Sequence, residues 1–213
     1  PLYSSAASDV YKRQAIYGGE VPDNAKLTVQ SDTPEIDFLD LKSELEKTIQ
    51  GGLKIRVQST HAVLELQTDQ MGKARTALKS IRPNIRVMST GESLEIYKEV
   101  GLPKDVASRF NLKNMSGSHG IGHTRMATES AVTTMGAHPF NTGIDQCLVH
   151  NGSLSNHNSL RRKLRRDGIN IETENDTEVG AAYITWKIQQ GSSLGEALAV
   201  SYTHLTLPTN REV

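Results

Sequence analysis

Hydrophobic residues recur with two different spacings in the first half of the chain, and the spacings predict the order of its elements. Four segments alternate between apolar and polar residues, as half-buried strands do: 26–30, 53–58, 62–67 and 85–88. Two segments carry apolar residues at helical spacing: 34–50, with Ile36, Leu39, Leu41, Leu45 and Ile49, and 71–81. Glycines at 51–52 end the first helix, and Pro83 follows the second. The pattern therefore predicts strand, helix, strand, strand, helix, strand.

This βαββαβ order resembles a ferredoxin-like module, which we expect over residues 26–90. Its two middle strands form a hairpin around 59–61, so we expect His61 in the turn or at the surface. Beyond it, 94–100 is compatible with a strand or a short helix. A helix should then run from Pro103 through Phe110. We interpret 26–111 as this module and a connector.

Strands and loops dominate from Gly120 onwards, followed by two helices. We expect a buried strand over 120–124 that ends at Arg125, and a second strand over 146–150. An amphipathic helix over 155–167 should place Leu160 and Leu164 inward. The next helix continues to 189 and starts with Asn175 as N-cap and Glu178 three residues later, the pattern of a capping box.

Composition excludes several classes of protein. The 213 residues contain 24 basic and 24 acidic side chains, so the net charge gives no case for binding nucleic acid or an anionic membrane. No apolar run approaches the roughly 20 residues that span a bilayer. A single cysteine, Cys147, excludes an internal disulfide framework and fits a reducing, cytoplasmic setting. The basic run at 161–166 is interpreted as the solvated outer face of a helix.

The two ends of the chain look foreign to the rest. One DNA element read in opposite orientations can encode both 9–14 and 200–205, and it looks like a sequencing-library adaptor. We therefore exclude 1–14 and 200–213 from the fold reasoning as adaptor-derived tails. On this interpretation the chain is a fragment of a longer protein.

Candidate chemistry concentrates in 120–156, which is rich in Gly, His, Asn and hydroxyl residues and suits a pocket for a small zwitterion. Arg125 could capture a carboxylate through two hydrogen bonds, or form a structural ion pair. Asn151 and Gly152 could form an oxyanion hole, or only a turn. Asp176 could bind a ligand ammonium, or only complement a helix dipole.

Two other kinds of chemistry fit the sequence poorly. His119 and His123 have helical ligand spacing, but the Gly-Ile-Gly between them argues against a helix, and no zinc motif accompanies them. We expect no metal and no cofactor. Cys147 lies within a strand and nothing in the sequence positions a base for it, so we expect it to be buried and inert.

Four ordered motifs resemble the class II glutamine amidotransferases. They are Gly-His-Thr-Arg-Met-Ala-Thr at 122–128, Ala-His-Pro-Phe at 137–140, Val-His-Asn-Gly-Ser-Leu-Ser-Asn-His at 149–157 and Glu-Asn-Asp-Thr-Glu-Val at 174–179. More closely, residues 15–199, including the run at 89–107, look like the amidotransferase subunit related to N-methylglutamate synthase and glutamate synthase.

The resemblance implies an α+β fold of the N-terminal-nucleophile hydrolase type, an αββα sandwich of two antiparallel sheets between helical layers. Residues 15–25 and 112–199 would form this domain, with 26–111 inserted. In the family, an N-terminal Cys thiolate attacks the glutamine side-chain amide with its own α-amino group as base, and releases ammonia and then glutamate. The ammonia would serve a synthase partner in a glutamate-synthase-like complex.

The resemblance also assigns roles to individual residues. Arg125 would hold the α-carboxylate of glutamine and Asp176 its α-ammonium group, while Asn151 and Gly152 would stabilise the oxyanion. Two further positions would line the glutamine pocket: Thr128 and His138.

One departure from the family is large. The chain has no Met-Cys-Gly start, and Cys147 lies in a different motif, so we expect this chain to be inactive and its untruncated parent to hydrolyse glutamine. Two alternatives stay open: the amidotransferase domain of a sugar-phosphate or phosphoribosyl amidotransferase, and a non-catalytic glutamine-binding regulatory subunit. The acceptor of the ammonia is not specified by the sequence.

Overall fold

The computed structural model describes residues 23–124 and 133–205, and it describes side chains as far as residue 199. The described residues fall into two compact units, 23–138 and 139–205. We call them the first and the second unit and describe each by itself. Both are mixtures of helices and antiparallel strands, as predicted for an α+β protein.

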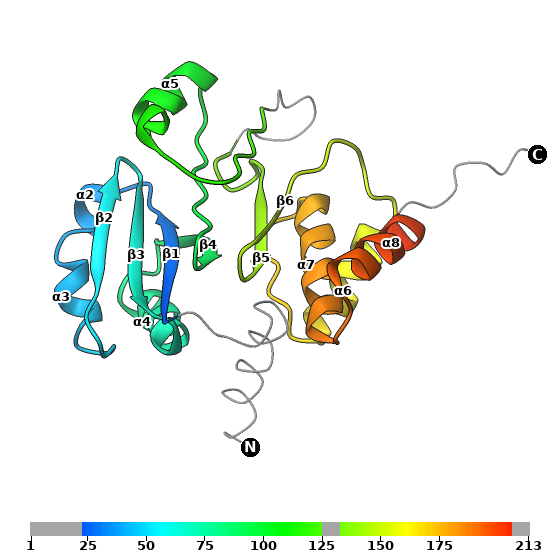
Figure 1. The fold of residues 1–213 in the computed structure, drawn as a ribbon, viewed down its shortest axis with the longest axis horizontal. Coiled ribbons are helices and arrows are strands. Elements are labelled where there is room, and N and C mark those ends of the chain that lie inside the picture. Colours follow the sequence, from blue (N-terminus) through cyan, green and yellow to red (C-terminus); the bar gives the residue numbers. More distant parts are fainter. Residues whose placement is uncertain (1–22, 125–132, 206–213) are drawn as a thin grey trace, which may run out of the picture. The chain divides into compact units, whose positions relative to one another are not determined.

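The first unit is built on a four-stranded antiparallel sheet with the strand order β2-β3-β1-β4 (Figure 1). Its elements are β1 (Asn24–Gln30), α2 (Pro34–Asp37), α3 (Leu41–Leu45), β2 (Lys54–Gln58), β3 (His61–Gln67), a 3-10 turn (Thr68–Gln70), α4 (Met71–Ile81), β4 (Arg86–Gly91), α5 (Pro103–Arg109) and a second 3-10 turn (Leu112–Asn114). The predicted succession of strands along the chain is confirmed, and so are α4 and the helix after Leu102. The insertion of residues 26–111 into another domain stays a prediction.

One face of this sheet forms the main hydrophobic core of the unit. Alternate residues of β1 and β3 pack against the apolar sides of α3 and α4. The cluster includes Leu27, Val29, Leu64, Leu66, Leu41, Leu45, Ala74 and Leu78. The period of two along the strands and the i, i+4 spacing along the helices therefore meet at one interface, as binary patterning requires.

The single helix predicted over 34–50 is wrong, because the segment forms two short helices. Asp40 adopts a left-handed conformation with φ 55°, which ends one helical path and starts another. Leu39 is consequently 63% exposed, whereas Leu41 is fully buried. The apolar spacing from Leu41 onward therefore indicated a helix correctly. Ile36 and Leu39 precede the change of chain direction at Asp40 and do not belong to that helix.

The opposite face of the sheet is also covered, and this overturns the expectation for His61. His61 lies in β3 and is fully buried, with its ring against Phe110 (centroids 4.9 Å apart) and Tyr97 (5.6 Å). Both aromatic residues come from the segment that follows the sheet. Residues far away in sequence therefore bury a side chain that local pattern placed in a turn.

His61 is held in its neutral form by this environment. Its Nε2 accepts the Lys98 backbone N–H at 3.3 Å, so the ring proton resides on Nδ1, 3.1 Å from the Thr60 hydroxyl. Thr60 in turn donates to the Glu99 carboxylate at 3.1 Å. Burial lowers the pKa of His61 from 6.5 to about 4, although the negative charge of Glu99 opposes the shift.

Two other expectations for the first unit are not met. Residues 94–99 form neither the strand nor the helix considered for them. Residues 120–124 form no strand and are not buried: Ile121 is 58% exposed. Residues 120–124 are too short a segment to establish a strand pattern, and their apolar and small side chains did not by themselves indicate burial.

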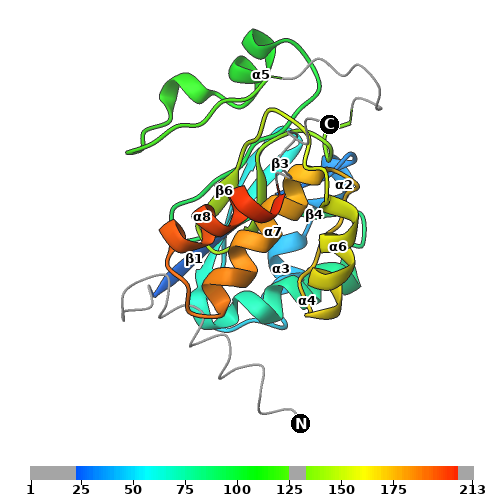
Figure 2. The same cartoon turned by 90° about the vertical axis from the view of Figure 1, so that its right-hand side faces the viewer.

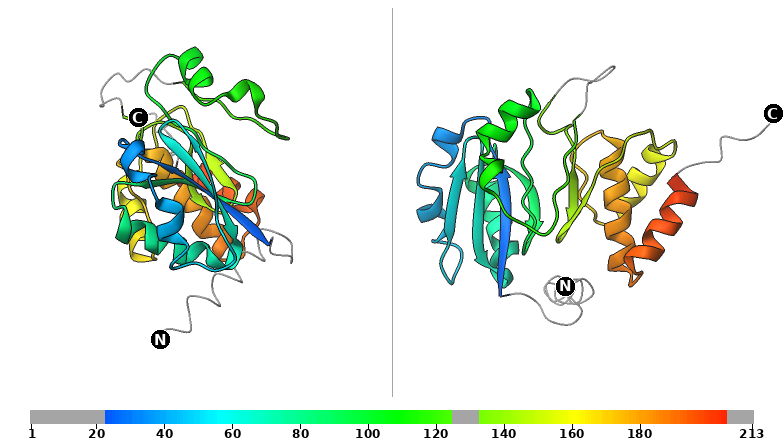
Figure 3. Two further views of the ribbon diagram at one scale, coloured as in Figure 1. Left: turned by 90° about the vertical axis from the view of Figure 1, so that its left-hand side faces the viewer. Right: turned by 45° about the horizontal axis from the view of Figure 1, so that its top comes forward.

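The second unit places three helices beside a short hairpin. Its elements are β5 (Phe140–Gly143), β6 (Gln146–Leu148), α6 (His157–Arg166), α7 (Asp176–Gln189) and α8 (Leu194–Leu205). β5 and β6 pair in antiparallel fashion. α7 lies between α6 and α8 in Figure 2, and Figure 3 shows the hairpin beside the helices. The αββα sandwich of two stacked sheets stays an inference from the family resemblance.

The middle helix of this unit, α7, is buried on nearly all sides. Every residue from 177 to 185 is buried, and the core joins α7 to Leu154, Leu164 and Ile171. The sequence Val-Gly-Ala-Ala-Tyr-Ile at 179–184 is apolar or small all round, which is the composition of an enclosed helix. Leu164 is inward as predicted and fully buried, and Leu160 packs against the same cluster.

No helix in the described part of the chain is both long enough and apolar enough to cross a membrane.

The environment of His61 predicts a pH-dependent stability of the first unit. Since the folded pKa of about 4 lies below the unfolded value of 6.5, the unfolded chain binds a proton first as the pH falls. The free energy of unfolding should therefore fall between pH 6.5 and 4, by at most about 3 kcal/mol from this residue. Urea unfolding at several pH values should show a shallower pH dependence in His61→Gln. Replacing the exposed His119 by Gln is the control, and an equal flattening there would contradict the assignment.

Candidate active site

A hydrogen bond between a turn and a helix terminus brings three of the six predicted site residues, Asn151, Gly152 and Asp176, into one part of the second unit. The backbone N–H of Leu154 donates to Oδ2 of Asp176 at 2.7 Å. Leu154 lies two residues after Gly152, and Asp176 is the first residue of α7. Asn151, Gly152 and Asp176 therefore belong to one local structure.

The N-terminus of α7 forms as its sequence predicts. Asn175 has extended backbone angles, and its side-chain oxygen accepts the Thr177 N–H at 2.8 Å, so it is the N-cap. Asp176 follows in the first turn, where a carboxylate interacts favourably with the helix dipole. One of its oxygens is used by Leu154. Among the described residues the other has no hydrogen-bond partner, and it can accept a bond from a ligand.

The predicted capping box is wrong in one half. The buried Glu178 carboxylate does not reach back to Asn175 but turns to the preceding loop. It accepts the N–H groups of Glu172 at 2.8 Å and Thr173 at 2.6 Å, and the Thr173 hydroxyl at 2.5 Å. The Asn175 N–H instead donates to the Thr173 hydroxyl oxygen at 3.2 Å. Glu178 thus fixes the loop that leads into α7.

Arg161 differs from the other basic residues of α6 and corrects the interpretation of 161–166. Its neighbours in the run are exposed, whereas Arg161 is 4% exposed. Its guanidinium forms an ion pair with Glu174 and donates to the Asn158 side chain and the Asn175 carbonyl, both at 3.3 Å. The helical spacing indicates this burial, but it was not used in interpreting 161–166. Arg161 lies three residues before the inward-facing Leu164 and so on the same side of the helix.

The turn at 151–152 has a backbone that suits glycine. Gly152 has φ +156°, and a Cβ there would lie 3.1 Å from Cε1 and Nε2 of the His150 ring. Asn151 is exposed, and among the described residues its side-chain amide has no hydrogen-bond partner. An exposed amide next to an open glycine N–H can stabilise an anionic oxygen.

A second glycine allows α7 to approach this turn. A Cβ at Gly180 would lie 3.2 Å from a methyl group of Leu148 in β6 and 3.3 Å from one of Leu154. The strand before the turn and the residue bonded to Asp176 therefore both press against the same point of the helix.

The other predicted site residues are placed differently. Arg125 and Thr128 lie outside the described residues. His138 belongs to the first unit, where it is buried and packs its ring against His123, with centroids 4.3 Å apart.

Cys147 lies in β6 and is half-buried rather than fully buried as expected. Burial raises the pKa of its thiol. Less of the nucleophilic thiolate therefore forms at neutral pH than in a free cysteine.

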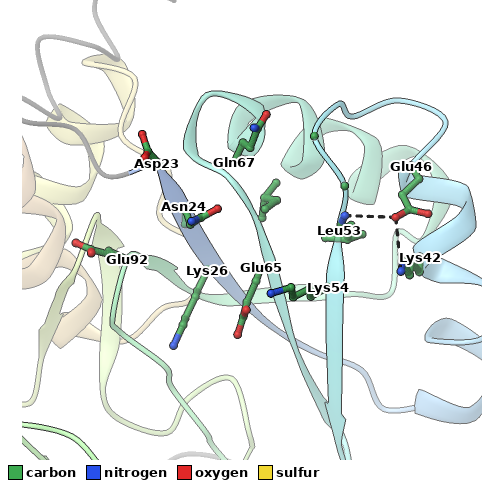
Figure 4. Close-up of a pocket in the computed structure, with 14 residues that line it drawn as sticks. Asp23, Asn24, Lys26, Lys42, Glu46, Leu53, Lys54, Glu65, Gln67 and Glu92 are labelled. Atoms are coloured by element: carbon green, nitrogen blue, oxygen red, sulfur yellow. Dashed lines mark hydrogen bonds and ion pairs between the residues drawn. The ribbon is translucent and has the colours of Figure 1, made fainter.

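The described residues offer no metal site, and they contain a pocket away from the Asn151–Gly152 turn. No group of three or more His, Cys, Asp or Glu side chains in this part of the chain is arranged to hold a metal ion. A pocket of about 630 Å³ lies on the first unit, over β1, β3 and the start of β2 (Figure 4). Several of its charges are already paired, Lys26 with Glu95 and Lys42 with Glu46.

The bonds of Glu178 predict its contribution to stability. In Glu178→Gln one acceptor oxygen is replaced by a donor, which would face the N–H group of either Glu172 or Thr173. The free energy of unfolding should fall by about 2 kcal/mol, since hydrogen bonds to a charged group are lost in a buried place. The matched control is Glu172→Gln, an exposed carboxylate in the same loop. Urea unfolding that finds the two variants equally stable would contradict the role of Glu178.

Comparisons with known proteins agree with this geometry. Residues 110–198 match the family model described as glutamine amidotransferase domain. Over 186 residues the chain is 59% identical to the glutamine amidotransferase-like protein GlxB of Rhizobium meliloti (strain 1021), covering 86% of this chain and 61% of that protein.

Two further relatives are glutamine–fructose-6-phosphate aminotransferases (isomerizing). The protein of Aliivibrio fischeri (strain ATCC 700601 / ES114) is 38% identical over 121 residues, covering 57% of this chain and 20% of the relative. That of Methanosarcina mazei (strain ATCC BAA-159 / DSM 3647 / Goe1 / Go1 / JCM 11833 / OCM 88) is 39% identical over 109 residues, covering 50% and 17%. This chain therefore spans less than two thirds of the length of these relatives. Residues 110–198 are therefore similar to the glutamine amidotransferase domain, and the relatives that the chain resembles carry amidotransferase or aminotransferase names.

Proposed function

We propose that this domain binds glutamine and belongs to a class II amidotransferase of the N-terminal-nucleophile type, a class in which an N-terminal cysteine releases ammonia from the side-chain amide. The observation that carries the proposal is the bond from the Leu154 N–H to Asp176, because it joins the Asn151–Gly152 turn to a helix terminus with an available carboxylate oxygen. The match of residues 110–198 to the amidotransferase domain supports the same assignment.

Opposite charges would hold the amino-acid end of glutamine. Asp176 would accept the α-ammonium group through the oxygen that Leu154 leaves available. The guanidinium of Arg125 would bind the α-carboxylate with two parallel hydrogen bonds, a geometry that lysine cannot reproduce. Thr128 and His138 would line the rest of the pocket.

The reacting amide would lie at the Asn151–Gly152 turn. Attack on the amide carbon places negative charge on its oxygen, which the Asn151 side-chain amide and the Gly152 N–H would stabilise. Each such donor contributes roughly 3 kcal/mol to the stability of a tetrahedral intermediate. The lack of a Cβ at Gly152 leaves room for the substrate oxygen to approach the backbone.

The nucleophile of the class II reaction is a cysteine at a chain N-terminus, whose α-amino group acts as base. Cys147 does not fit this role because it lies within β6 and burial raises the pKa of its thiol. Since Cys147 is the one cysteine of the sequence, we propose that this chain binds glutamine without hydrolysing it. A parent protein with an N-terminal cysteine would complete the reaction.

The ammonia would pass to a synthase partner, and we propose a complex of the glutamate-synthase type, related to N-methylglutamate synthase. The similarity to the amidotransferase-like protein GlxB over 86% of this chain supports the amidotransferase part of this proposal, and the complex itself is proposed from the resemblance of residues 15–199. The aminotransferase relatives favour a second candidate, a sugar-phosphate amidotransferase, although the likeness reaches only 17–20% of their length. A purely glutamine-binding subunit would share the pocket.

Glutamine binding tests the proposal directly. Isothermal titration should detect glutamine binding to the chain, and Asp176→Asn or Arg125→Lys should weaken it about tenfold each, since each removes a charged contact to the ligand. The exposed Asp167→Asn and Arg166→Lys are matched controls and should bind as the parent chain does. Undetectable binding of glutamine, or unchanged affinity in both site variants, would refute the proposed site.

The position of Cys147 predicts that it takes no part in the chemistry. Cys147→Ser should leave glutamine affinity unchanged, and neither form should release glutamate from glutamine. Alkylation of Cys147 by iodoacetamide at pH 8 should be slower in the folded chain than in urea, because burial disfavours the thiolate. Glutaminase activity that disappears in Cys147→Ser would overturn this assignment.

A further inference from the structure

A buried arginine is costly unless its donors are satisfied, and the terminal nitrogens of Arg161 donate mainly to the segment that precedes α7. One further bond goes to Asn158 within α6, and among the described residues Nε has no partner. Arg161 is 4% exposed, whereas the side chain of its ion-pair partner Glu174 is 82% exposed. The pair is thus half in solvent and is a weak source of stability by itself. The contact that reaches the backbone is the bond to the Asn175 carbonyl.

This contact fixes a particular peptide unit. The Asn175 carbonyl, which accepts Arg161 Nη2 at 3.3 Å, belongs to the same planar peptide as the Asp176 N–H. The side chain of Asn175 is occupied by the Thr177 N–H, and its own N–H by the Thr173 hydroxyl. Hydrogen bonds to Asn175 and its neighbours therefore fix the orientation of the peptide unit between Asn175 and Asp176.

The choice of ion-pair partner leaves Asp176 available. Arg161 takes Glu174 as its salt-bridge partner, and the Asp176 carboxylate accepts the neutral N–H of Leu154. A carboxylate that accepts only a neutral donor keeps its charge for a cationic ligand.

We infer that Arg161 is a positioning residue of the amidotransferase site, which aims the Asp176 carboxylate at the α-ammonium group of glutamine by fixing the Asn175 carbonyl. The inference rests on the proposed function. It assigns Arg161 no contact with glutamine, so its effect should be transmitted through Asp176 alone.

A ligand without the ammonium group separates positioning from a general structural role. Glutaramate is glutamine that lacks the α-ammonium, so it offers nothing for Asp176 to bind. Arg161→Gln should weaken glutamine binding about tenfold and change glutaramate binding by less than about twofold. A general loss of the pocket would weaken both ligands equally and would overturn the inference.

Two further variants keep the result interpretable. Arg161→Lys retains the charge and can still reach Glu174, but a single ammonium lacks the fork that also reaches the Asn175 carbonyl. It should fold and still lose most of the glutamine affinity that Arg161→Gln loses. The matched control is the exposed neighbour Arg162→Gln, which should bind both ligands like the parent chain.

A double-mutant cycle tests whether the effect passes through Asp176. In the Asp176→Asn background, Arg161→Gln should cause no further loss of glutamine affinity. Additive losses would show that Arg161 acts by another route and would overturn the inference.

Hydrogen exchange at one amide distinguishes failure of the inference from failure of the proposed function. The Leu154 N–H is bonded to Asp176, so Arg161→Gln should speed its exchange at least severalfold, while Arg162→Gln should not. If the parent chain binds no glutamine, the proposed function fails, and Leu154 exchange still decides whether Arg161 positions Asp176. Unchanged Leu154 exchange in Arg161→Gln would refute the positioning.

Discussion

The hydrogen bond from the Leu154 backbone to the Asp176 carboxylate is the contact on which the candidate site depends. It is a charge-assisted bond of 2.7 Å between a turn and a helix terminus. The hydrogen bonds within strands and helices do not connect these two parts of the chain. Gly180 favours this approach, because a Cβ there would force the side chains of Leu148 or Leu154 to move by a few tenths of an ångström. A small residue in the middle of α7 thus helps the segment around the turn to pack closely against the helix.

Charged side chains supply the frame around this contact. Glu178 and Arg161 are both buried, and both direct their polar atoms to backbone groups of residues 172–175. Loops carry unpaired N–H and C=O groups that must be satisfied when they are buried. An anion accepts the N–H groups of Glu172 and Thr173 and a cation donates to the Asn175 carbonyl, and together these bonds hold an irregular segment in one conformation.

Local signals in the sequence predicted those elements that local interactions form. The helix over 71–81 and the N-cap Asn175 depend on apolar spacing and a side-chain-to-backbone bond within a few residues, and both are confirmed. His61 was misplaced because its burial depends on Tyr97 and Phe110, which lie more than 30 residues away in the printed sequence.

The candidate site divides along a similar line. The motifs around Asn151 and Asp176 identified two residues that the structure joins through Leu154, but their roles toward glutamine came from the family resemblance. Arg161 was missed since a run of like charges suggests a solvated surface, and only the helical phase relative to Leu164 separates it from its exposed neighbours.

The packing of Phe110 has a consequence for how this protein divides into independently folding parts. The family match begins at this residue, which is fully buried against His61 in the sheet of the first unit. The start of the family match and the edge of the compact first unit therefore do not coincide. A piece of the chain that began at Phe110 would expose an aromatic side chain that the sheet normally shields from water. The matched region therefore depends on the sheet to keep Phe110 out of water.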